Sequence, residues 1–178
     1  MNARRLKRLA GLVVVCALGL TLATPLAAEP SLGPLTVLSV RSKDNRSVAL
    51  ASTPVGNNLF AVWDGIVEGQ RRVIFRERLA GEWLPEMLLD SDPAAQPNSA
   101  CIASDAAGNP WVAWRARMDG RFQPVVATRI GGRWIHWFPT ETTLWPKGDA
   151  EEVSIAVTDS GVPCVAWQEA IGAGYSVR

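Results

Sequence analysis

Short runs of alternating apolar and polar residues, separated by turn formers, extend along most of this chain. Residues 59–63 are apolar and rich in aromatic and β-branched types, and residues 73–79 alternate apolar with charged side chains. Such runs predict β-strands, and Gly, Pro and Asn between them predict tight turns. The first strands expected on this basis lie at residues 47–53, 59–63, 73–79 and 83–89.

The same pattern returns twice along the chain. Gly-Asn-Pro-Trp-Val-Ala-Trp at 108–114 is matched by Gly-Val-Pro-Cys-Val-Ala-Trp at 161–167 and, more loosely, by residues 57–63. Gly-Glu-Trp at 81–83 is followed 51 residues later by Gly-Arg-Trp at 132–134. A fixed period of this length indicates a repeat architecture. An antiparallel meander of four strands and about 50 residues has the size of one β-propeller blade.

We therefore predict an all-β fold, a partial β-propeller of about three four-stranded antiparallel blades. The expected parts are an N-terminal segment at 29–46 with an outer strand at 35–40, blade 1 at 47–97, blade 2 at 98–151 and an incomplete blade 3 at 152–178. Strands are expected in blade 2 at 100–104, 111–115, 124–130 and 134–138, and in blade 3 at 153–158 and 163–168.

Three blades do not close a ring, and this leaves three interpretations open. The chain is the front of a longer propeller, or two copies associate to close a ring of six blades, or the pattern belongs to a β-sandwich. The chain's last residues, 175–178, fall where the third strand of blade 3 is expected to begin. The interpretation as a fragment of a longer propeller is the one that this position favours.

The N-terminus has the layout of a signal peptide. Four basic residues precede an apolar run at 12–23 and a stretch of small residues that ends at Ala28. This pattern predicts a helical signal peptide over 1–28, and therefore an exported protein that is periplasmic or secreted. The apolar run of about twelve residues falls short of the roughly 20 needed to cross a bilayer, so no stable membrane span is expected.

Charge and composition narrow the range of partners. Without residues 1–28, 14 of the 18 basic residues remain against 17 acidic ones, so the net charge is about −3, and no nucleic-acid partner is expected. A single histidine and dispersed cysteines predict no metal and no cofactor. Cys101 and Cys164 occupy non-equivalent positions in successive repeats, where each fits a small core residue, and whether they pair is left open.

Residues 154–169, with an Ile-Ala strand, an Asp-Ser-Gly turn and a Val-Ala-Trp strand, resemble the repeat of bacterial exported sialidase-like (Asp-box-type) β-propeller proteins. The resemblance implies an architecture, whereas the sialidase catalytic pattern does not carry over. The chain has a single tyrosine, Tyr175, which is expected on the same short loop as Glu169. Asp105 and Asp159 are expected to bond backbone amides within turns.

The second strand of every unit ends in a tryptophan followed by a polar residue that differs each time. Aromatic faces stack on sugar rings and polar neighbours bind hydroxyl groups, so these ends are candidate ligand sites. Packing of the indole rings between neighbouring sheets is the competing interpretation. The candidate ligand-binding residues are Trp63, Asp64, Trp114, Arg115, Trp167 and Gln168.

These patterns favour an exported, non-enzymatic β-propeller repeat module that binds a glycan or a protein through its loops. The loops expected to carry such a site lie at 65–71, 116–121 and 168–174. The alternative is part of a sialidase-like glycoside hydrolase or lyase whose active site needs further blades. No catalytic residue is assigned. Besides a glycan or a protein, a second copy of the chain is an expected partner, since self-association would close the propeller.

Overall fold

A computed structural model of the chain describes residues 36–54, 56–90, 92–138 and 148–178. The chain divides into two compact units, residues 1–36 and residues 37–178, and the fold described below is that of the second unit. The predicted signal peptide lies outside the described residues. No helix among the described residues is both long and apolar enough to cross a membrane.

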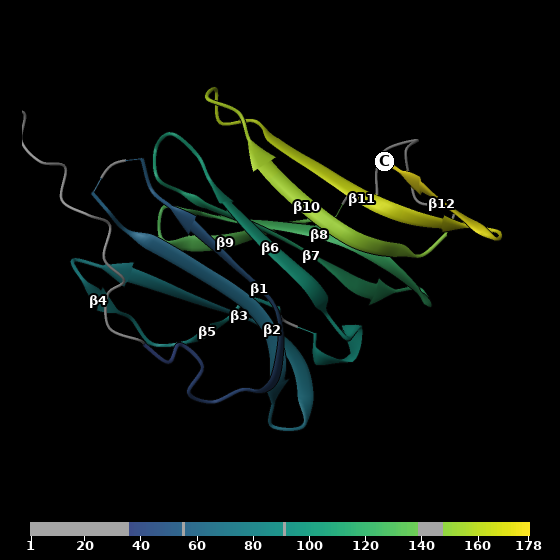
Figure 1. Cartoon of the computed structure of the whole chain (residues 1–178), viewed down its shortest axis with the longest axis horizontal. Coiled ribbons are helices and arrows are strands. Elements are labelled where there is room, and N and C mark those ends of the chain that lie inside the picture. The colour runs from purple at the N-terminus through teal and green to yellow at the C-terminus, as the bar shows by residue number, and fades with distance from the viewer. Residues whose placement is uncertain (1–35, 55, 91, 139–147) are drawn as a thin grey trace, which may run out of the picture. The chain divides into compact units, whose positions relative to one another are not determined.

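The described residues form antiparallel strands, grouped in three sheets (Figure 1). The first sheet contains β1 (Lys43–Ser52), β2 (Leu59–Val67), β3 (Gln70–Leu79), β4 (Glu82–Trp83) and β5 (Met87–Leu88). The 3₁₀ turn η1 (Pro93–Ala95) leads to the second sheet, with β6 (Asn98–Ser104), β7 (Pro110–Met118), β8 (Arg121–Ile130) and β9 (Arg133–Trp137). The third sheet contains β10 (Ala150–Val157), β11 (Pro163–Ile171) and β12 (Gly174–Val177).

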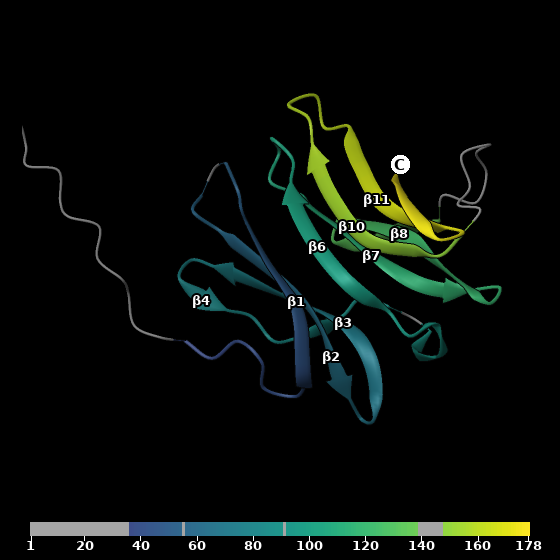
Figure 2. The ribbon, with the colours of Figure 1, turned by 45° about the vertical axis from the view of Figure 1, so that its right-hand side comes forward.

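The prediction of an all-β fold with one antiparallel meander per repeat is confirmed. The first strands of the sheets, β1, β6 and β10, contact one another in sequence, as inner strands of adjacent blades do (Figure 2). The described residues do not form a closed ring. The fold of the described residues is therefore a series of three antiparallel sheets.

Equivalent residues in the first two sheets have the same strand register. Val62 pairs with Phe75 in the first sheet, and Ala113 pairs with Val126 in the second, each 51 positions further along. Because side chains alternate between the faces of a strand, this register gives the second sheet one face toward the first sheet and one toward the third.

Two apolar clusters hold the sheets together. The first cluster joins Phe60, Val62 and Phe75 to Val112 and Trp114 of the second sheet. The second cluster joins the opposite face of the second sheet to β10 and β11 through Ala113, Val126 and Val153. The Val-Ala-Trp tryptophan of the second sheet therefore faces the preceding sheet.

The strands extend further than the sequence indicated, and the expected loops at 65–71 and 116–121 are wrong. β2 and β3 are joined by Glu68 and Gly69 alone, with φ angles of 52° and 82°, and β7 and β8 by Asp119 and Gly120, with φ angles of 51° and 81°. Two successive positive φ angles define the type I′ turn that tight hairpins favour. The third expected loop, at 168–174, is also mostly strand, since β11 continues to Ile171.

The outer strand expected at 35–40 is not formed in the described residues, which begin at residue 36 and enter β1 at Lys43. The backbone N–H of Val40 donates to the Glu86 carboxylate at 2.6 Å, and the carbonyl of Leu38 accepts from Arg76 at 2.8 Å. Side chains therefore take the hydrogen bonds that a neighbouring strand would have made.

This irregular segment covers the first sheet on the face that has no preceding sheet. Leu38 packs against the cluster of Trp63 and Ile74, and the Trp63 indole N–H donates to the Ser42 hydroxyl at 3.0 Å. The fourth strand expected at 83–89 is divided into β4 and β5, with Pro85 between them. Proline has no N–H for the ladder, which accounts for the interruption.

Candidate functional site

The first predicted pair, Trp63 and Asp64, is buried. Trp63 is 2% exposed, and Asp64 is fully buried. One carboxylate oxygen of Asp64 accepts from Arg71 at 2.6 Å, and the other has no hydrogen-bond partner. Neither side chain is presented to a ligand from solution.

The second pair, Trp114 and Arg115, lies between sheets. Trp114 is 2% exposed and meets the His136 ring edge-on at a centroid distance of 5.8 Å. Arg115 donates to the carbonyl of Ala150 at 2.9 Å and to the Glu151 carboxylate at 3.0 Å, which ties the second sheet to β10. The tryptophan thus packs the interface with the first sheet, and the arginine joins the interface with the third.

The third pair differs from the other two because Trp167 lines an open cavity, described below, and Gln168 is exposed. The Trp167 indole nitrogen is buried without a hydrogen-bond partner. Neighbouring residues on a strand point to opposite faces, so the polar residue after each tryptophan lies across the sheet from it. The six predicted residues therefore do not converge on one site.

The glutamate and tyrosine expected on one short loop instead occupy two strands. Glu169 pairs with Ser176, and Tyr175 pairs with Ala170, so the two side chains lie on opposite faces of the third sheet. Glu169 is 1% exposed and accepts from Arg178 at 2.8 Å, whereas Tyr175 is 70% exposed. This arrangement does not form a nucleophile pair.

Two other carboxylates, one buried and one half-buried, also face arginines. Asp90 accepts from Arg72 at 2.5 Å and from the backbone N–H of Val73 at 2.7 Å, and Glu77 accepts from Arg129 at 2.7 Å. The Glu77 to Arg129 contact joins the first sheet to the second. Charge pairing and hydrogen bonding of this kind are what buried carboxylates require for structural reasons.

The turn after the first strand is built in the same way in each repeat. Asp105 accepts from the backbone N–H of Asn109 at 2.8 Å, as predicted for a turn aspartate. In the third repeat Thr158 takes this place, because its hydroxyl accepts from the N–H of Val162 at 3.1 Å, so the role assigned to Asp159 belongs to its neighbour. In the first repeat Thr53 accepts from Asn58.

Burial alone would raise the pKa of Asp105. Hydrogen bonds from the Asn109 side chain and backbone, and from the Trp111 indole at 3.2 Å, outweigh burial and hold the pKa of the carboxyl below its ordinary value. The charged form of Asp105 is thus stabilised in the folded protein.

Cys101 and Cys164 are both free thiols. Cys101 packs in the interface between the second and third sheets, where burial raises its pKa to about 11. Cys164 is exposed, and its partner residue across the ladder is Ala156. Since Val165 belongs to the interface cluster, Cys164 lies on the other face of the third sheet, and the two cysteines do not pair.

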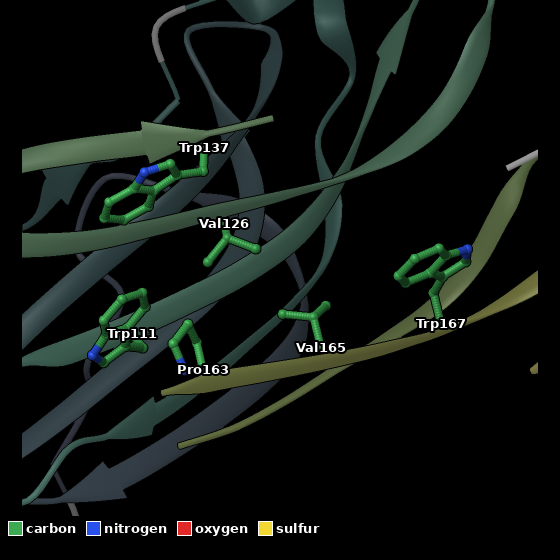
Figure 3. A pocket seen from close by; sticks show the side chains of 6 residues that line it. All are labelled: Trp111, Val126, Trp137, Pro163, Val165 and Trp167. Carbon is green, nitrogen blue, oxygen red and sulfur yellow. The ribbon is translucent and has the colours of Figure 1, made fainter. Parts of the chain in front are cut away.

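A cavity of about 380 Å³ opens between the second and third sheets, at the end of the interface where β9 and β11 face each other (Figure 3). The indole rings of Trp111 and Trp137 stack at a centroid distance of 5.5 Å and an interplanar angle of 15°. The cavity, called here the tryptophan pocket, is lined by Trp111, Val126, Trp137, Pro163, Val165 and Trp167.

The tryptophan pocket and the filled space between the first and second sheets differ at one register position. Val126 holds the register position that Phe75 holds in the first sheet. Phe75 is 2% exposed, and the Trp134 ring packs edge-on against it at 5.0 Å, so the corresponding space between the first and second sheets is filled. The difference could have been found in the sequence, because aligning the two hairpins by their repeat places Val126 at the position equivalent to Phe75.

A second hollow, of about 430 Å³, lies near the tight turn between β2 and β3. Its lining includes Arg71, Asn98 and Phe122. Arg71 is already held by Asp64 at 2.6 Å and by Asp44 at 2.5 Å, and Asn98 accepts from Arg115. Its polar groups are therefore largely engaged within the protein.

The described residues hold no group of three or more His, Cys, Asp or Glu side chains that could bind a metal ion. No family model matches the chain, and comparison with curated proteins found no significant match.

Proposed function

We propose that this chain is an exported, non-catalytic β-propeller-like repeat module that binds a partner molecule through the tryptophan pocket. The observation that carries the proposal is an open cavity of about 380 Å³ with three indole rings in its walls. Cavities of this size with aromatic walls are typical of binding sites. We infer export from the signal-peptide pattern of residues 1–28. We infer the β-propeller-like architecture from the resemblance of the repeats to those of sialidase-like β-propeller proteins.

The lining favours an apolar group over a sugar. All six lining residues carry apolar or aromatic side chains. The Trp111 N–H is engaged by Asp105 at 3.2 Å. A sugar ring would stack on an indole, but apart from the indole N–H groups of Trp137 and Trp167 the lining side chains offer no hydrogen-bonding group, and each hydroxyl left without a partner costs about 1–3 kcal/mol. We therefore assign the pocket to an apolar side chain of a protein partner.

The state of the charged residues supports a binding role over a hydrolytic one. Glycoside hydrolysis needs two carboxyl groups placed on either side of the scissile bond. The buried carboxylates Asp64, Asp90 and Glu169 are each bonded to an arginine. Their charges are thus used to hold strands together.

The test is a titration of the full chain, followed through the tryptophan indole N–H signals by NMR. Benzyl alcohol is expected to shift the signals of Trp137 and Trp167, and N-acetylglucosamine is not. Trp63 is an internal control, since it is 2% exposed and bonded to Ser42. In a Trp137→Ala variant the shift at Trp167 should disappear, while a Trp83→Ala variant should respond as the wild type does.

Two outcomes of this titration count against the proposal. Shifts caused by the sugar, without shifts caused by benzyl alcohol, would assign the pocket to glycan binding. The absence of any response at Trp137 and Trp167 to either compound would remove the pocket as a binding site.

A further inference from the structure

The second hollow, near the tight turn between β2 and β3, carries two amide side chains in its wall. Its volume of about 430 Å³ lies in the range of small-molecule binding sites, and it is called here the hairpin hollow. Gln70 and Gln96 are exposed, and neither side chain forms a hydrogen bond with another described residue. An amide side chain has two donor hydrogens and an accepting oxygen. The hairpin hollow therefore presents both donors and acceptors to a ligand from solution.

An aromatic ring forms the apolar wall of the same hollow. Phe122, the second residue of β8, is half-buried and lines the hollow together with Ile66. The Arg115 guanidinium lies over the Phe122 ring, with its central carbon 4.8 Å from the ring centroid. Because this group covers one face of the ring, the other face is the one left for a ligand. A flat apolar surface beside amide groups suits a sugar ring, whose C–H face stacks while its hydroxyl groups bond to the amides.

The connection between the first two sheets has an unusual backbone conformation at this hollow. Gln96 and Ser99 have φ angles of 47° and 57°, which residues other than glycine rarely adopt. Gln96 also precedes Pro97, and a following proline restricts the backbone further. The Asn98 side chain donates to the Gln96 carbonyl at 3.2 Å and accepts from Arg115, so bonds within the fold hold this conformation. Backbone strain of this kind clusters at ligand-binding and active sites.

The charges around the hollow favour a neutral ligand. Among the described lining residues, Arg71 is the only charged one. One of its terminal nitrogens donates to Asp64 at 2.6 Å, and the other donates to Asp44 at 2.5 Å. Arginine binds a ligand carboxylate best through two parallel N–H groups, and both terminal nitrogens of Arg71 are occupied. An acidic sugar would therefore meet two carboxylates and an arginine that they already hold.

We propose that the hairpin hollow binds a neutral sugar ring, with Phe122 as the stacking surface and the amides of Gln70 and Gln96 as the groups that bond to its hydroxyls. The site goes beyond the proposed function, since none of its described lining residues lines the tryptophan pocket. All of these residues belong to the first two sheets or to the connection between them. Arg71 and Asn98 have structural roles, because their hydrogen bonds are made within the protein.

The test is an NMR titration of the full chain with the methyl glycosides of glucose, galactose and mannose, each beside the uronate of the same sugar. At least one neutral glycoside is expected to shift the side-chain amide signals of Gln70 and Gln96 and the ring signals of Phe122. The corresponding uronate should bind more weakly, because Arg71 is held by carboxylates. The neutral glycosides should leave the indole N–H signal of Trp167 unchanged, which separates this site from the tryptophan pocket.

Three glutamine-to-alanine variants provide a matched set. Gln70→Ala and Gln96→Ala each remove one amide and should weaken binding roughly three- to tenfold, the value of one hydrogen bond. Gln168→Ala makes the same change at an exposed glutamine of the third sheet, outside the hollow, and should leave binding unchanged. Phe122→Leu keeps an apolar side chain without the flat ring and should weaken binding roughly fivefold or more. An unchanged indole signal of the buried Trp63 confirms that each variant is folded.

Three results would overturn the sugar site. The first is the absence of shifts at Gln70, Gln96 and Phe122 with all three neutral glycosides. The second is tighter binding of a uronate than of its neutral counterpart, since the hollow would then recognise an anion. The third is an equal loss of affinity in Gln70→Ala and Gln168→Ala, because the amide of the hollow would then have no specific role. None of these results bears on the titration of the tryptophan pocket with benzyl alcohol, and a failure of that titration leaves this site in place.

Discussion

The two interfaces between neighbouring sheets are built on the same register but are filled differently. Between the first and second sheets, Phe75 and Trp134 meet at 5.0 Å and close the apolar layer. Between the second and third sheets, Val126 stands at the position of Phe75 and lines a cavity of about 380 Å³ that is bounded by indole rings. The smaller side chain at this register position is one difference between an interface that is filled and one that has room for a ligand.

The largest expected effect comes from removing the ring that fills the first interface. Phe75→Ala should lower the free energy of unfolding by about 3–5 kcal/mol, because a large cavity replaces a fully packed ring. Val126→Ala, at the equivalent position of the second interface, should cost about 1 kcal/mol, since it only enlarges an existing cavity. Urea denaturation of both variants measures the difference, and equal losses would mean that the two interfaces are packed alike.

Adding a ring should have opposite effects on the two faces of β8. Val125→Phe, at a position that is 1% exposed in the first interface, should destabilise the fold by about 1–3 kcal/mol through overpacking. Val126→Phe fills the tryptophan pocket and should stabilise the fold by up to about 1 kcal/mol. Thermal unfolding of the two variants tests this contrast, which would not hold if Val126→Phe also destabilised the protein.

The equivalent turns of the second and third sheets should respond differently to acid. The lowered pKa of Asp105 means that its contribution to stability is complete above the ordinary aspartate pKa of about 4 and is lost as the pH falls through the lowered value. Asp105→Asn should therefore flatten the acid limb of the stability curve measured by denaturation at a series of pH values. Thr158→Val in the third sheet removes a group that does not titrate, so it should shift the curve without changing its slope.

The smallest effect concerns the thiols. At pH 8 a soluble alkylating reagent should modify Cys164 at least about tenfold faster than Cys101, whose pKa of about 11 and packed position both suppress the thiolate. Mass spectrometry of digested protein gives the two rates. Comparable rates would show that the interface between the second and third sheets opens in solution, and would weaken the contrast with the first interface.

The strands and their order could be predicted from the sequence because alternation and turn residues are local signals. The hairpin turns at Glu68–Gly69 and Asp119–Gly120 were missed, although Asp-Gly is a strong hairpin signal, because the second strand of each unit was expected to end at the tryptophan and the polar residue after it, whereas β2 runs to Val67 and β7 to Met118. Only the structure shows that Asp64 lies within β2, opposite Val73, and that its carboxylate accepts a hydrogen bond from the Arg71 side chain at 2.6 Å.

The candidate site was predicted only in part. Trp167 lines the pocket, but its equivalents Trp63 and Trp114 are 2% exposed, and local sequence does not distinguish the three. The distinction comes from what lies across the interface, namely Ser42 and Leu38 for Trp63 and the first sheet for Trp114. The role of Val126 follows only from comparing registers between sheets.

The segment at 37–42 has a consequence for how such a chain can vary in length. It covers one face of the first sheet, because Ser42 accepts a hydrogen bond from the Trp63 indole and Leu38 packs against the cluster that contains Trp63. A duplicated unit of about 50 residues inserted after the first sheet would leave that cap untouched, whereas one inserted before it would separate the cap from its tryptophan. The segment at 37–42 and the sheet that carries Trp63 are therefore expected to stay together when the number of repeats changes.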